Sequence, residues 1–141
     1  MAYPLLAPVV ALIAWTLLML VWMYATRLPA MRAAQLKPDP HAPRGEQMAL
    51  LPAKVRWKAD NYNHLLEEPT IFYALCFALT LLQVSSHAAL IWAWSYVGLR
   101  VVHSLVQVLV NTIEVRFVVF CLSNVALFAL TYLAFAKLLW H

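Results

Sequence analysis

Residues 61–82 read NYNHLLEEPTIFYALCFALTLL, a polar half that runs directly into an apolar half. The carboxylates of Glu67 and Glu68 come immediately before Pro69, at the point where the apolar residues begin. A carboxylate at the entrance to an apolar segment is costly in lipid, so it must lie outside the hydrocarbon or have a buried partner. Which of the two applies depends on whether the apolar half crosses a membrane.

The composition of the chain is typical of a membrane protein. Of its 141 residues, 65% are hydrophobic and only 11% are charged, which leaves too little polar surface to enclose a soluble core. Only two glycines occur and alternating strands of about ten residues are absent, which argues against a membrane barrel. We therefore predict an all-α integral membrane protein, a left-handed four-helix bundle in a single domain. Its expected transmembrane helices are about 3–25, 53–84, 88–110 and 115–140, with a loop over 26–52.

The basic residues predict the orientation of the bundle. Seven of the ten Lys and Arg residues lie between the first apolar block, which ends at Ala25, and the second, which begins at Pro69: Arg27, Arg32, Lys37, Arg44, Lys54, Arg56 and Lys58. Positive loops stay in the cytoplasm, so both termini are expected on the opposite side. No Lys or Arg precedes the first block, which we interpret as a retained helix rather than a secretory signal. Contact with anionic lipid is a second role open to these charges, and nucleic acid is not an expected partner.

Polar side chains recur at helical spacing in the second and third blocks. At about 100° per residue, one face of the second helix carries Arg56, Asp60, Asn63 and Glu67. The same arithmetic gives a face of the third helix with Tyr96, Arg100, His103, Gln107, Asn111 and Glu114. A single intramembrane Asn or Gln is explained by an interhelical hydrogen bond. Two facing polar stripes that end in opposite charges instead favour a polar cavity with a function.

Depth along the helices predicts a buried ion pair between Glu67 and Arg100. Each residue lies about 16 Å inside the cytoplasmic end of its helix, at 1.5 Å per residue. Equal depth, facing stripes and opposite charge all favour contact between the two side chains, directly or through one water. Asn63 and His103 are expected to lie close enough to join the same network.

The residues next to Glu67 give further expectations. Glu68 lies about 100° further round the helix and is expected to point elsewhere, to another subunit or to water. Pro69 has no N–H to donate to the preceding turn, so a local kink is expected there. His64 and Glu67 have a spacing that suits a metal, but no third ligand is evident. Both cysteines fall inside apolar blocks, and we expect buried, inert thiols.

Arg116 opens the fourth block close to the cytoplasmic interface. It either extends to the lipid headgroups or closes the mouth of the polar cavity. In the second case the cavity contains several cations and amides, which suit an anionic, amide-rich, water-soluble ligand. The residues concerned are Arg56, Lys58, Asn63, Arg100, Gln107 and Arg116.

These residues together resemble the MAPEG family, the membrane-associated proteins in eicosanoid and glutathione metabolism, and its bacterial members in particular. The resemblance covers nearly the whole chain and is carried by Asn63, Glu67, Pro69, Phe72, the run RVVHS at 100–104, and Arg116. It implies a homotrimer in the lipid bilayer, expected in the bacterial inner membrane, with sites between neighbouring subunits. Each site would hold glutathione in a U shape and a lipophilic small molecule at the lipid side.

The resemblance implies a glutathione-dependent transferase or peroxidase that acts on hydrophobic electrophiles. Arg116 falls where the prostaglandin E synthase branch has a catalytic-type Arg, and it is the candidate that would lower the pKa of the glutathione thiol. The candidate glutathione-binding residues are Arg56, Asn63, Glu67, Arg100, His103 and Gln107.

Three positions depart from the better-known eukaryotic members. Leu66 stands where they have Glu, Gln107 where they have Tyr, and Phe117 where they have Ser. The last two changes remove hydroxyl donors that would stabilise a thiolate. They favour an alternative function, a non-catalytic lipid-binding or scaffold protein of the same fold.

Overall fold

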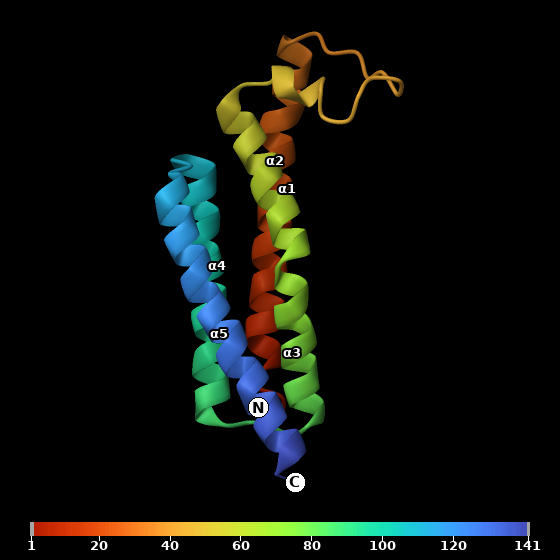
Figure 1. The fold of residues 1–141 in the computed structure, drawn as a ribbon. Coiled ribbons are helices and arrows are strands. Elements are labelled where there is room, and N and C mark those ends of the chain that lie inside the picture. The colour runs from red at the N-terminus through yellow and green to blue at the C-terminus, as the bar shows by residue number, and fades with distance from the viewer. Residues whose placement is uncertain (1, 141) are drawn as a thin grey trace.

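The regular structure of the chain is helical throughout the part that the computed structural model describes, residues 2–140. Its elements are α1 (Leu6–Ala33), the 3₁₀ turn η1 (Met48–Leu50), α2 (Ala53–Glu67), α3 (Pro69–Leu81), α4 (His87–Leu109) and α5 (Ile113–Leu139). Because α2 and α3 follow each other along one line, the chain forms four rods (Figure 1). The predicted all-α fold with four helices is confirmed.

Three helices, α1, α4 and α5, are long and apolar enough to cross a membrane. The fourth rod is divided between α2 and α3, with Glu68 between them in a helical backbone conformation. Pro69 is the first residue of α3, a position that suits a residue without an N–H. The interruption therefore falls where the sequence predicts a kink, and the rod ends at Leu81, before the expected residue 84.

Helix α1 continues to Ala33, well past its expected end at residue 25. It includes Pro29 and Arg32 in its last turns and packs against α2 along this part of its length. The expected end at residue 25 followed the end of the apolar residues, but contact with α2 stabilises the additional turns and offsets the one backbone hydrogen bond that Pro29 removes.

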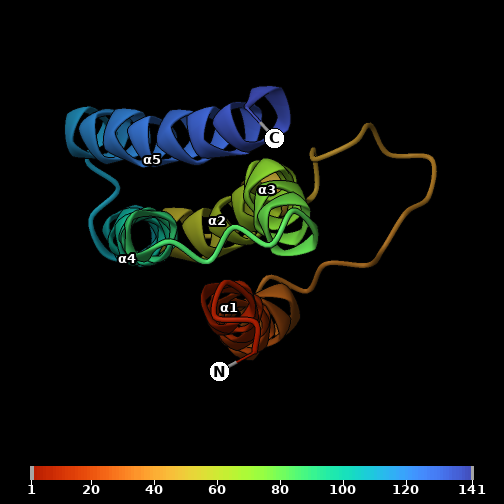
Figure 2. The ribbon, with the colours of Figure 1, turned by 90° about the horizontal axis from the view of Figure 1, so that it is seen from below.

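The two ends of the molecule differ in shape. Figure 1 shows α1 and α2 projecting past the turn between α4 and α5, with the 34–52 loop at their tip and both termini at the other end. Viewed along the rods, α2–α3 lies between α1 and α5, with α4 beside it, and the loop extends to one side (Figure 2). The loop end is therefore built from α1, α2 and the loop alone.

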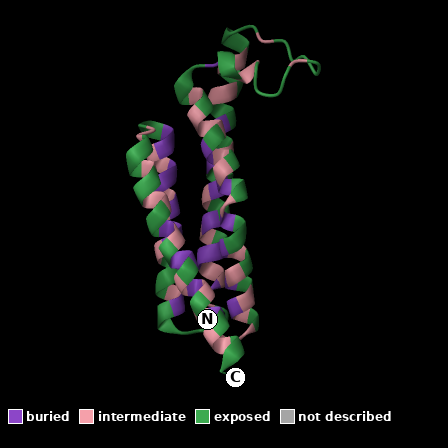
Figure 3. Ribbon diagram, in the orientation of Figure 1, coloured by how far each residue is buried: buried purple, intermediate pink, exposed green. Residues whose placement is uncertain are grey.

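Buried residues follow the sides on which the rods meet (Figure 3). The core is apolar along most of its length and includes Leu12, Leu79 and Leu130. Near its middle, the rings of Phe72 and Tyr96 stack with centroids 4.5 Å apart and an angle of 18°. Large apolar side chains on the outer sides of α1 and α5 are exposed, as expected of surfaces that contact lipid.

Candidate functional site

A buried ion pair joins the second rod to α4, but its acid is not the predicted one. Arg100 is completely buried and pairs with the carboxylate of Glu68. Glu67 is exposed. The predicted Glu67–Arg100 pair is therefore wrong, because one residue turns a helical side chain by about 100° and the core packs against a different side of α2.

The side of the second rod that meets α4 is set by its apolar half. We call it the inward face, and it comprises Asn61, Leu65, Glu68, Phe72, Cys76 and Leu79, all buried or partly buried. These positions follow helical spacing straight through the interruption at Pro69. Extending the buried face of α3 backwards would have selected Glu68 from the sequence. The polar stripe that includes Glu67 lies on roughly the opposite side.

Asn61 is the second polar residue of the inward face. Its Nδ2 donates to Ser104 Oγ on α4 at 2.7 Å, and both side chains are buried. Asn63, which was expected near Arg100, is exposed. A buried hydrogen bond between two side chains fixes the rotation of α2 against α4.

Two histidines lie beside the ion pair. The ring centroids of His64 on α2 and His103 on α4 are 5.1 Å apart, and the His64 ring also stacks on Phe120 of α5. Nε2 of His64 lies 4.0 Å from the Glu68 carboxylate. The histidines therefore connect the ion pair to the surface between α2, α4 and α5.

A pocket of about 210 Å³ opens at this surface, and we call it the histidine pocket. Its lining residues are His64, His103, Ile113, Arg116, Phe117 and Phe120. It combines aromatic walls with the cation of Arg116. Its α5 residues belong to the first turns of that helix, the end of α5 that lies nearer to the loop in Figure 1.

The turn between α4 and α5 orients Arg116. Its Nη1 donates to Asn111 Oδ1 at 2.7 Å. Asn111 has φ +56°, a left-handed conformation that Asn tolerates after a helix end, and its N–H donates to Val106 O at 2.6 Å. In residues 2–140 no carboxylate lies within ion-pair distance of Arg116, whereas Arg100 has Glu68.

Several buried polar atoms of this region have no hydrogen-bond partner among the described residues. They are Asn61 Oδ1, Tyr96 Oη, His103 Nδ1, Gln107 Oε1 and Arg116 Nε. Unpaired buried polar groups are rare in native proteins unless water or a ligand satisfies them. Both donors and acceptors are therefore available here to a polar ligand.

The structure brings together part of the predicted set of site residues. Arg100, His103 and Gln107 occupy the buried face of α4, as the stripe predicts, and Arg116 lines the histidine pocket beside His103. Arg56 and Asn63 line a different pocket at the loop end, and Glu67 is exposed. Sequence reasoning missed Glu68, Asn61 and His64. The ligand-binding roles of the predicted residues stay predictions.

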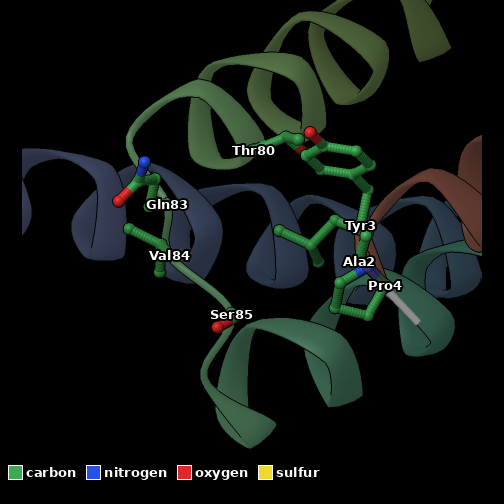
Figure 4. Close-up of a pocket in the computed structure, with 8 residues that line it drawn as sticks. Ala2, Tyr3, Pro4, Thr80, Gln83, Val84 and Ser85 are labelled. Carbon is green, nitrogen blue, oxygen red and sulfur yellow. The ribbon is translucent and has the colours of Figure 1, made fainter.

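Other features of the chain lie outside this region. A pocket of about 280 Å³ at the opposite end is lined by uncharged residues of the N-terminus and the end of α3, among them Tyr3, Thr80 and Gln83 (Figure 4). Cys76 is buried and Cys121 is exposed, which corrects the expectation of two buried thiols. Within residues 2–140 no group of three His, Cys, Asp or Glu side chains is placed to hold a metal ion.

Comparison with protein families gives one match. The family model described as "MAPEG family" matches residues 5–136. Comparisons with curated proteins and with solved structures give no match. The matched range includes the inward face and the histidine pocket.

Proposed function

Because the chain belongs to the MAPEG family, we propose that it is a glutathione-dependent transferase or peroxidase that acts on hydrophobic electrophiles. One observation carries the proposal. Arg116 lines the histidine pocket without an acidic partner in the described part of the chain, whereas Glu68 neutralises Arg100. The pocket therefore retains a net positive charge for an anionic ligand.

In this proposal Arg116 stabilises the ionised thiol. A free thiol has a pKa of about 8.5, and a nearby positive charge lowers it, which raises the thiolate fraction at neutral pH. Bound glutathione would supply the nucleophilic sulfur, and the membrane would concentrate the lipophilic partner. No nucleophile from the protein is required.

The buried polar groups near Arg116 suit the amide and carboxylate groups of glutathione. His103 Nδ1 and Gln107 Oε1 are buried without partners among the described residues, and glutathione carries both amide donors and carboxylate acceptors. Glu68 holds Arg100 in place, so this guanidinium would orient the ligand rather than lower the thiol pKa. The residues present therefore fit glutathione in chemical type.

We further propose that the site is completed in a homotrimer. The histidine pocket, at about 210 Å³, is smaller than the roughly 300–1,000 Å³ of typical small-molecule sites. A neighbouring chain would supply the missing walls. Glu67 is exposed and does not line its own histidine pocket, so in this assembly it would face a neighbour's site. Mass measurement in detergent tests the assembly, and a stable monomer would contradict it.

The orientation predicted from the basic residues is part of the same proposal. The loop end of the molecule carries Arg27, Arg44 and Arg56, and both termini lie at the other end (Figure 1). This asymmetry supports a cytoplasmic loop end and non-cytoplasmic termini. A bacterial inner membrane is proposed from the resemblance to bacterial members of the family alone.

Thiolate formation tests the catalytic proposal directly. Ultraviolet absorbance of the purified protein with glutathione should show a thiolate band at neutral pH. Arg116→Ala should abolish the band, and Arg116→Lys should retain part of it because the charge remains. Arg32→Ala, which removes an exposed cation on the last turn of α1, should leave the band unchanged. An undiminished band in Arg116→Ala would remove Arg116 from the mechanism.

A lipid-binding or scaffold role is the second candidate, and one observation favours it. Gln107 and Phe117 replace hydroxyl-bearing residues of the eukaryotic branch, and Phe117 lines the histidine pocket next to Arg116. No hydroxyl from either position can therefore stabilise a thiolate. A wild-type protein that binds no glutathione and forms no thiolate would support this second role.

A further inference from the structure

A larger pocket lies at the loop end, away from the histidine pocket. We call it the loop-end pocket, and its volume of about 420 Å³ falls within the range of small-molecule sites. Three segments build it: late α1 with Arg27, the loop and η1 with Arg44 and Met48, and early α2 with Arg56 and Asp60. It therefore forms within one chain.

The charge of the loop-end pocket is strongly positive. Arg27, Arg44 and Arg56 line it, and Asp60 is the one carboxylate among its lining residues. In the described part of the chain none of the three arginines has a carboxylate within ion-pair distance. Three uncompensated guanidinium groups around one hollow attract an anion.

The loop that carries Arg44 is held in place by side-chain hydrogen bonds. Gln47 Nε2 donates to Lys37 O at 2.8 Å, and Gln47 Oε1 accepts from Asp39 N at 3.1 Å. Gly45, next to Arg44, has φ +85°, a conformation that favours glycine, and its carbonyl accepts from Ala49 N at 2.9 Å. These bonds join the two sides of the loop next to Arg44 and hold its backbone in place.

Arg56 is oriented from the opposite wall. Its Nε donates to Leu51 O at 3.1 Å, a contact that leaves the two terminal Nη atoms out of the bond. A guanidinium fixed in this way presents a planar pair of donors. Planar donor pairs match the oxygens of phosphate and carboxylate.

The remaining lining residues favour phosphate on a larger, partly apolar molecule. Met48, Leu51 and Val55 provide apolar surface next to the arginines. We propose that the loop-end pocket binds a phosphate group, which Arg27, Arg44 and Arg56 contact. Two sources share this chemistry, an anionic phospholipid headgroup and a water-soluble phosphate ester. The loop-end pocket shares no lining residue with the histidine pocket, where the thiol of glutathione is proposed to bind.

The test uses the full chain purified in an uncharged maltoside detergent. Binding of dihexanoyl phosphatidylglycerol and of inorganic phosphate is measured by isothermal titration at constant ionic strength. Arg44→Gln and Arg56→Gln should each weaken binding of the phosphate probe roughly tenfold or more, the effect of losing one charge-assisted hydrogen bond. Arg32→Gln removes the same charge from an exposed position outside the pocket and should leave binding unchanged.

A variant that should bind the probe more tightly distinguishes loss of the site from misfolding. Asp60→Asn removes the carboxylate that repels an anion, so it should tighten binding while all three arginines remain. If inorganic phosphate fails to displace bound phosphatidylglycerol, the ligand is a lipid headgroup. If inorganic phosphate displaces it, the ligand is a soluble phosphate ester. The proposal is overturned if neither probe binds, if Arg32→Gln weakens binding as much as the pocket variants, or if glutathione displaces the probe.

Discussion

Two polar faces run along α2 on roughly opposite sides, and they meet different surroundings. On the inward face, Glu68 pairs with Arg100 and Asn61 donates to Ser104. The other side, which we call the outward stripe, carries Arg56, Asp60, Asn63 and Glu67, of which the first three line the loop-end pocket and the last is exposed. Polar residues of one helix thus hold the bundle together on one side and face an open pocket on the other.

The contrast follows from what a buried charge requires. Arg100 is completely enclosed, so it needs a carboxylate in a fixed position, and Glu68 provides it. Arg56 is exposed to water and is held only by a backbone carbonyl. Substitutions on the inward face should therefore change stability, and substitutions on the outward stripe should change binding.

The largest expected effect is the loss of the Glu68 carboxylate. Glu68→Gln leaves the buried Arg100 without its counter-charge and should lower the free energy of unfolding by about 3 to 5 kcal/mol. Glu67→Gln, the matched change one residue earlier, should have little effect because this side chain is exposed. Thermal unfolding in detergent measures both. Equal losses from the two variants would mean that α2 is rotated differently in the membrane.

A double mutant sharpens the same assignment. Glu68→Gln combined with Arg100→Gln removes both charges together, and two amides can still hydrogen-bond. Relative to the sum of the single losses, the double variant should recover about 1 to 3 kcal/mol. Glu67→Gln with Arg100→Gln is the control and should show no recovery. Additive losses in the Glu68 pair would refute the ion pair.

The sequence predicts the buried side of some helices better than that of others. Helix α4 is apolar along most of its length, so its few polar residues must share the buried side, and Arg100, His103 and Gln107 do. In α2 polar residues occur all round, so polarity alone does not select the buried side. The apolar residues of α3 identify the buried side of α2, because their helical spacing, continued towards the N-terminus, reaches Glu68.

The loop end was less predictable for another physical reason. Its shape depends on the Gln47 hydrogen bonds and on the left-handed conformation of Gly45, neither of which has a periodic signature. The sequence predicted positive charge and a loop there. It did not predict that Arg27, Arg44 and Arg56 surround one pocket.

Asn61 gives the next largest effect. Asn61→Ala removes the donor to Ser104 and leaves a buried hydroxyl with one partner fewer, which should lower stability by about 1 to 2 kcal/mol. Asn63→Ala, on the outward stripe, is the matched change at an exposed side chain and should have little effect. Urea unfolding in mixed micelles compares the two. If Asn63→Ala lowers stability more than Asn61→Ala, then the outward stripe and not the inward face packs against α4.

The smallest expected effect concerns a cation on the packed side of α2, near the loop end. Lys58 Nζ lies 5.3 Å from the centre of the Trp22 ring on α1, and no carboxylate of the described residues is within ion-pair distance of it. A cation over an aromatic ring at a partly exposed position contributes about 0.5 to 1 kcal/mol. Lys58→Gln should lose that amount, and so should Trp22→Leu after correction for the smaller side chain. Because the two changes remove one contact, their double variant should lose less stability than the sum of the two single losses.

Lys54→Gln is the control. It lies on an exposed part of the same helix and should have no such coupling to Trp22→Leu. This last cycle measures whether Lys58, a charge on the packed side of α2, depends on a specific partner as Glu68 does, in contrast to the exposed charges of the outward stripe.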